Sequence, residues 1–291
     1  MIINPVKIHK DSLPEIDFDT LKELVLKTDE EIYSLRLNIK RDKHKLGPNI
    51  VTDFLRDSII INSDLLISTT QISHNFINSI IILYRTFLEM KIDFLWFYSH
   101  YMENEKVGVI LAKRYYQISR NNFLKFAPNF KRIEKTDPFF KDIKNNFSIE
   151  DDISRAKLEN YIELVNPDEK DKKIKYLQRT DWHAVPGLYE SKNQINFTCR
   201  AKVASELAQK LFNLKAAPYI ENWKLLNQFS HPTAMQYKII DEKLSKKLQC
   251  RNLNIFLGFL HDMINVMCHY MKIEPNAKIR EIRLRFNYMS L

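Results

Sequence analysis

The spacing of apolar residues constrains this chain more than any other feature of its sequence. Through most of the 291 residues, apolar side chains recur every three or four positions, which is the period of an amphipathic α-helix. Early in the chain, for example, Leu21, Leu24 and Val25 are followed by Ile32 and Ile39. The pattern predicts an all-α protein built as a bundle of several helices.

The same period predicts the order of the elements. Helices are expected over residues 21–39, 49–68, 72–102, 107–127, 196–213, 218–231 and 241–271. Prolines and mixed charges predict loops near 128–147 and 166–192. We therefore expect an N-terminal helical segment (1–48), a helical bundle (49–275) and a basic C-terminal tail (276–291), in which alternating residues predict a short β-strand or a basic arm.

The most apolar stretch, residues 76–98, is interrupted by Arg85, Glu89, Lys91 and Asp93. A membrane-spanning helix needs about 20 mostly apolar residues with few charges. We therefore expect a buried helix at the centre of the bundle and no membrane segment. Because the first residues lack the apolar core of a signal peptide, the chain is expected to be cytoplasmic.

Composition excludes several classes of site. Only four glycines are present, so glycine-rich phosphate loops and dinucleotide-binding turns are not expected. Three irregularly spaced cysteines predict neither a disulfide framework nor a cysteine zinc site. The net charge of +9 favours an anionic partner such as nucleic acid.

Arg85 and Glu89 stand four residues apart within the most apolar helix and therefore share a face. Asn78 and Asp93 lie near the same line. One interpretation is an intrahelical ion pair that anchors neighbouring helices, since buried charges persist only when paired. The other is that Arg85 presents its guanidinium to a phosphate while Glu89 orients it or a histidine.

A second pair, Asn227 and His231, falls at the end of the helix expected after Pro218. A helix C-terminus stabilises imidazolium, so His231 is a candidate general acid or base near neutral pH. The alternative is a histidine that makes structural hydrogen bonds only.

Arg114 is expected on the helix at 107–127, where it either snorkels to solvent or contacts a phosphate. Trp182 and His183 follow Arg179 in a proline-flanked stretch. The indole and the imidazole are expected either to cap a pocket or to belong to a surface loop with one buried tryptophan.

Metal chemistry has little support in the sequence. His261 and His269 are eight residues apart on one expected helix, too far apart to hold one ion. Neither a metal ion nor another cofactor is expected. The basic tail, with Arg283, Arg285 and Tyr288, suits contact with a nucleic acid or pairing with a second chain.

The sequence resembles an uncharacterised bacterial helical family whose late motif is Tyr-x-x-Leu-Ser-x-x-x-His-Pro. The resemblance rests on Arg85-x-x-x-Glu89, Ala112-x-Arg114-Tyr115, Trp182 and Trp223-x-x-Leu226-Asn227-x-x-x-His231-Pro232. Trp223 and Asn227 stand where that family has tyrosine and serine. The family is similar in helical layout to the HEPN and abortive-infection proteins of prokaryotes, many of which are metal-independent ribonucleases of toxin or phage-defence systems.

The resemblance implies a metal-independent ribonuclease-like effector, with His231 as general acid or base, Arg85 and Arg114 on the phosphate and Glu89 orienting either group. Substrate contacts are expected from Asn78, Arg179, Trp182, Trp223 and Asn227. The alternative is a non-enzymatic helical interaction module or nucleic-acid binder. Expected partners are RNA, a second copy of the chain, or a protein from the same defence operon.

Overall fold

The computed structural model describes residues 17–41, 49–73, 76–116, 118–119, 181–184, 195–212, 219–230 and 242–273. These residues are almost entirely helical and include no β-strand, so the predicted all-α class is confirmed for the described part of the chain. The expected C-terminal strand or arm and the boundaries near 48 and 275 lie outside these residues and stay predictions.

The chain forms two compact units, Met1–Glu103 with Phe197–Leu291, and Asn104–Asn196. In the first unit the helices are α1 (Phe18–Arg41), α2 (Asn49–Gln71), α3 (Ile77–Glu103), α8 (Phe197–Phe212), α9 (Tyr219–Ser230) and α11 (Glu242–Met271). In the second unit, residues 105–116 are helical and residues 181–184 form a turn.

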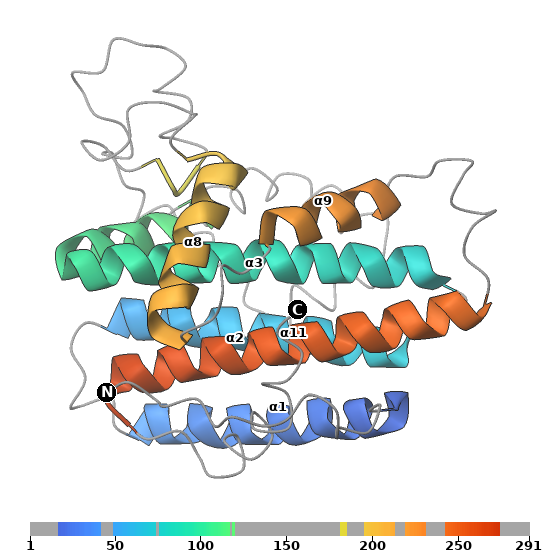
Figure 1. The fold of residues 1–291 in the computed structure, drawn as a ribbon. Coiled ribbons are helices and arrows are strands. Elements are labelled where there is room, and N and C mark those ends of the chain that lie inside the picture. Colours follow the sequence, from blue (N-terminus) through green and yellow to red (C-terminus); the bar gives the residue numbers. More distant parts are fainter. Residues whose placement is uncertain are drawn as a thin grey trace, which may run out of the picture. The chain divides into compact units, whose positions relative to one another are not determined.

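Within the first unit, α3 is the central helix. It packs against α2 and α11 on one side and against α8 and α9 on the other, while α1 lies on α2 and α11 (Figure 1). From Phe94 to Tyr98 every side chain of α3 is buried, which confirms the expected helix at the centre of a bundle. No helix of the described residues is long and apolar enough to cross a bilayer.

The prediction that a helix begins at residue 72 is wrong, because α2 continues to Gln71 and α3 begins only at Ile77. The amide of Gln249 on α11 donates to the carbonyl oxygens of Thr69 and Ile72, at 3.2 Å each. These hydrogen bonds satisfy carbonyl groups that a helix end leaves without partners. A side chain 177 residues further along the chain thus stabilises the end of α2.

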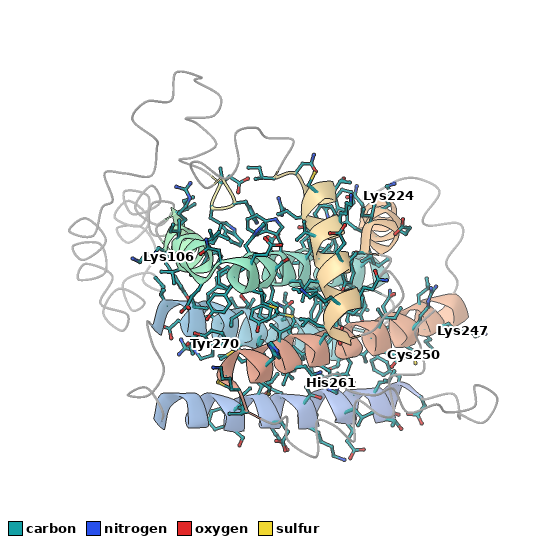
Figure 2. All side chains as sticks on the ribbon, turned by 60° about the vertical axis from the view of Figure 1, so that its left-hand side comes forward. Lys106, Lys224, Lys247, Cys250, His261 and Tyr270 are labelled. Atoms are coloured by element: carbon teal, nitrogen blue, oxygen red, sulfur yellow. The ribbon has the colours of Figure 1, made fainter. Side chains whose placement is uncertain are left out.

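α1 is held on α11 by a buried hydrogen bond between Thr28 and His261 (3.0 Å). Thr28 donates its hydroxyl proton to the carbonyl oxygen of Leu24 (2.8 Å). Its oxygen therefore accepts a hydrogen bond from Nε2–H of His261. Figure 2 shows His261 on the part of α11 that faces α1.

A buried ion pair joins α3 to α11. The Nζ atom of Lys91, which is 0% exposed, lies 2.7 Å from Oδ2 of Asp262. The same ammonium lies 3.8 Å from the ring centre of Phe259 and 5.4 Å from that of Tyr219 on α9. Burial, together with the negative charge of Asp262, raises the pKa of Tyr219 well above its ordinary value. The pair thus fixes how three helices meet.

We predict that Asp262→Asn lowers the free energy of unfolding by about 3–5 kcal/mol, because it removes the carboxylate from a charge buried in the core. The measurement is urea unfolding. As a control, the double variant Lys91→Met/Asp262→Leu removes both charges and is expected to recover most of the loss. Wild-type stability in Asp262→Asn would contradict this account.

α11 ends in a Schellman motif. The amide of Ile273 donates to the carbonyl of Cys268 (3.0 Å), and the amide of Lys272 donates to that of His269 (3.2 Å). Lys272 has a φ of 57°, the left-handed conformation that this motif requires at its penultimate position. That conformation strains any residue with a Cβ atom.

We predict that Lys272→Gly raises the free energy of unfolding by about 1 kcal/mol, because glycine adopts the left-handed conformation without strain. The measurement is again urea unfolding. Lys272→Ala is the matched control, since alanine removes the charge but keeps the Cβ atom, and its stability is expected to stay at the wild-type value. An equal gain in both variants would contradict the backbone explanation.

Candidate functional site

Arg85 and Glu89 form the intrahelical ion pair that their spacing allows. The Nε atom of Arg85 donates to Oε1 of Glu89 at 3.1 Å, and the indole Nε1 of Trp223 on α9 donates to the same oxygen at 2.8 Å. The two charged side chains are 32% and 38% exposed. The expectation of a deeply buried pair is therefore wrong, because Arg85 and Glu89 lie at the margin of the bundle rather than in its core.

Trp223 completes a contact between α3, α8 and α9. Its indole stacks on Phe197 of α8, with ring centres 4.5 Å apart, and the guanidinium carbon of Arg85 lies 5.7 Å from its ring centre. Trp223 follows the buried Tyr219 by one helical turn, so both face α3. In this arrangement the Glu89 carboxylate holds α9 on α3.

Asp93 has the same kind of role one turn further along α3. Its Oδ1 atom accepts a hydrogen bond from Nε of Arg200 on α8 at 2.8 Å. The polar stripe predicted on α3 thus carries two carboxylates, each of which bonds a neighbouring helix. Their contacts favour the structural interpretation of the stripe.

Arg114 belongs to the second unit, on the helix of residues 105–116, where it is 4% exposed. The helix is capped by Asn104, whose side-chain oxygen accepts from the amide of Lys106 at 3.1 Å. The Nη2 atom of Arg114 donates to the carbonyl oxygen of Asp181 at 3.3 Å. Arg114 thus meets the turn that carries Trp182, and it is a buried residue rather than a snorkelling one.

The turn at residues 181–184 is closed by a hydrogen bond from the amide of Ala184 to the carbonyl of Asp181 (3.2 Å). Within it, Oδ1 of Asp181 accepts from the amide of His183 (3.0 Å) and lies 2.5 Å from Nδ1 of its imidazole. A carboxylate has no proton to donate, so the proton sits on Nδ1. In the neutral ring, Nε2 is then the basic nitrogen.

One aromatic ring, that of Trp182, lies against this imidazole. The ring of Trp182 lies 4.0 Å from that of His183 and 5.5 Å from that of Tyr115, centre to centre. Trp182 is half-buried, whereas His183 is only 5% exposed. The cluster therefore combines a guanidinium, an imidazole and a carboxylate behind an indole that solvent reaches.

Burial lowers the pKa of Arg114 to about 10, with the negative charge of Asp181 acting in the opposite direction. The guanidinium remains charged at neutral pH but has lost much of its hydration. A desolvated cation interacts more strongly with an anion than a surface cation does, because the local dielectric constant is lower.

The other predicted site residues are placed only in part. His231 and Arg179, and the side chain of Asn78, lie outside the described residues. Asn227 is half-buried on α9, one turn after Trp223. The predicted residues thus fall into two groups. Arg85, Glu89 and Trp223 meet in the first unit, whereas in the second unit Arg114 contacts Asp181, the residue that precedes Trp182.

Asp181 was not singled out in the sequence, and His183 was considered only as a residue that could cap a pocket. The signal was the spacing Asp-x-His, which lets a carboxylate reach the imidazole across a single residue in a turn. His261, weighed in the sequence as a metal ligand, instead contacts Thr28, and the neighbouring Asp262 contacts Lys91. Among the described residues no three His, Cys, Asp or Glu side chains gather as a metal site.

Comparison with protein-family models, with curated proteins and with solved structures finds no match for this chain.

We predict that Arg114→Met leaves the free energy of unfolding equal to or above that of the wild type. Burial disfavours the charged guanidinium, and Asp181 keeps its hydrogen bonds with His183 when the guanidinium is gone, so no charge is left alone. Urea unfolding is the measurement. A loss of about 3 kcal/mol or more would instead identify Arg114 as a structural residue.

Proposed function

We propose that this chain is a ribonuclease that uses a histidine rather than a metal ion to move the proton. The single observation that carries the proposal is the contact between Asp181 and Nδ1 of His183, beside the buried Arg114. The resemblance noted in the sequence supports the same activity, as an effector of a toxin or phage-defence system.

In the proposed reaction, Nε2 of His183 removes the proton from a ribose 2′-hydroxyl. The resulting oxygen attacks the adjacent phosphorus, and the bond from phosphorus to the 5′-oxygen breaks. Asp181 holds the imidazole in the required tautomer and stabilises the imidazolium that forms, as a carboxylate does for a catalytic histidine. The 5′-oxygen leaves with a proton taken from the imidazolium or from water.

Arg114 supplies the second requirement, which is stabilisation of the charge that develops on the phosphate in the transition state. A fixed guanidinium in a desolvated site is suited to this, because it needs no reorganisation when the charge appears. Since His183 is 5% exposed, substrate contact requires the side chains that cover it to move aside. Trp182, half-exposed on a turn, is placed to do so.

We predict that His183→Ala lowers the rate of RNA cleavage by roughly a hundred- to ten-thousand-fold, which is the usual contribution of a general acid or base. His269→Ala is the matched control, because His269 is an exposed histidine on α11 of the first unit. Each variant is first checked for folding by thermal denaturation.

His231→Ala is measured beside these two variants because the sequence pattern assigns the proton transfer to His231. Loss of cleavage in His231→Ala with full activity in His183→Ala would contradict the proposed site. Asp181→Asn keeps an oxygen that accepts from Nδ1 but removes the negative charge, so it is expected to fold normally and to cleave more slowly than the wild type.

A second function is favoured by one observation in the first unit. Arg85, Glu89 and Trp223, which the sequence pattern assigns to a catalytic site, join α3 to α9. This is the arrangement expected of a helical interaction module whose polar residues specify packing. Absence of RNA cleavage by the folded wild-type chain would favour that function.

A further inference from the structure

Most exposed or half-exposed cations on the described helices of the first unit have an acidic residue three or four positions away in the sequence, and four of them contact it. Such pairs stabilise a helix, since residues three or four apart face each other. The pairs are Lys27 with Glu23 at 2.5 Å, Arg56 with Asp53 at 2.8 Å, Arg85 with Glu89 at 3.1 Å and Lys202 with Glu206 at 4.0 Å.

Lys247 and Arg251 on α11 depart from this pattern. Both are exposed, and they stand four residues apart, so they share a face of the helix. None of the residues three or four positions from either one is acidic, and Lys243 stands four positions before Lys247. Figure 2 shows Lys247 close to the beginning of α11. Like charges at this spacing destabilise a helix slightly, so their placement is better explained by an anionic partner than by stability.

The chemistry of this face selects among anionic partners. An anionic membrane surface binds helices that add an apolar face to their cations. No large hydrophobic side chain is exposed on the described part of α11. A polynucleotide strand needs no apolar face, because its affinity comes from cations that replace counterions along the phosphates.

We propose that Lys247 and Arg251 bind the sugar-phosphate backbone of a single-stranded RNA. The proposal rests on the proposed function in taking RNA as the ligand, but binding is measured without cleavage. Each phosphate contact with a single strand contributes about 0.7 to the slope of log K against log salt. Two contacts therefore contribute about 1.4, which corresponds to roughly 25-fold in affinity at 0.1 M salt.

The test compares Lys247→Gln/Arg251→Gln with Lys27→Gln/Lys202→Gln, in the full-length chain. Both double variants remove two exposed positive charges, but only the second removes cations that contact a carboxylate. The probe is a fluorescent 2′-O-methyl RNA strand, which lacks the hydroxyl needed for cleavage, titrated at several salt concentrations. Thermal denaturation checks that each variant folds.

We expect Lys247→Gln/Arg251→Gln to lose roughly 25-fold in affinity and about 1.4 in slope, with an unchanged or slightly higher melting temperature. The control is expected to lose less than threefold. Equal losses in both variants, or no loss in either, would overturn the proposal. The proposal would also be overturned if Lys247→Gln/Arg251→Gln lost binding to phosphatidylserine vesicles but kept its affinity for RNA. The two proposals can be contradicted separately. If RNA binding changes as expected but His183→Ala does not affect cleavage, the proposed active site is wrong, whereas RNA binding by Lys247 and Arg251 is supported.

Discussion

A charge taken out of water must find a partner, and this constraint determines how the described helices meet. Lys91 satisfies it with Asp262, from a helix that lies far along the chain, and with the rings of Phe259 and Tyr219. The ion pair joins α3 to α11, and the ammonium in turn contacts α9 through Tyr219. Glu89 and Asp93 then hold α9 and α8 on the outer side of α3, so polar contacts orient a bundle that apolar burial stabilises.

The same constraint operates in the second unit with a different result. Arg114 is as buried as a core residue, yet its pKa is lowered, so folding disfavours the charge that it carries. Lys91 meets a carboxylate directly, whereas Arg114 donates to the backbone carbonyl of Asp181. A charged group that folding disfavours is common at functional sites, where stability is given up for reactivity. This contrast supports the proposed reaction at His183, which the contact between Asp181 and Nδ1 of the imidazole carries.

The local spacing of apolar and charged residues predicted much of the fold. The period of apolar residues located α1, α2, α8, α9 and α11 to within a few residues, and the spacing of Arg85 and Glu89 predicted that they share a face. The end of α2 was not predictable, because it depends on Gln249 from α11. The pairing of Lys91 with Asp262 was not predictable either, since the two residues are 171 positions apart in the sequence. The partial exposure of Arg85 was also not predicted, because a helix that is buried over most of its surface can still present some side chains at the edge of the bundle.

The chemistry of the cleaved ends tests the central claim most directly. The folded wild-type chain is incubated with a single-stranded RNA in the presence of a metal chelator, and the ends of the fragments are identified by mass spectrometry. Proton removal from the 2′-hydroxyl by His183 predicts fragments with a 2′,3′-cyclic phosphate and a 5′-hydroxyl, and no cleavage at a 2′-deoxy position. Fragments with a 5′-phosphate, or cleavage that continues at 2′-deoxy positions, would contradict the account.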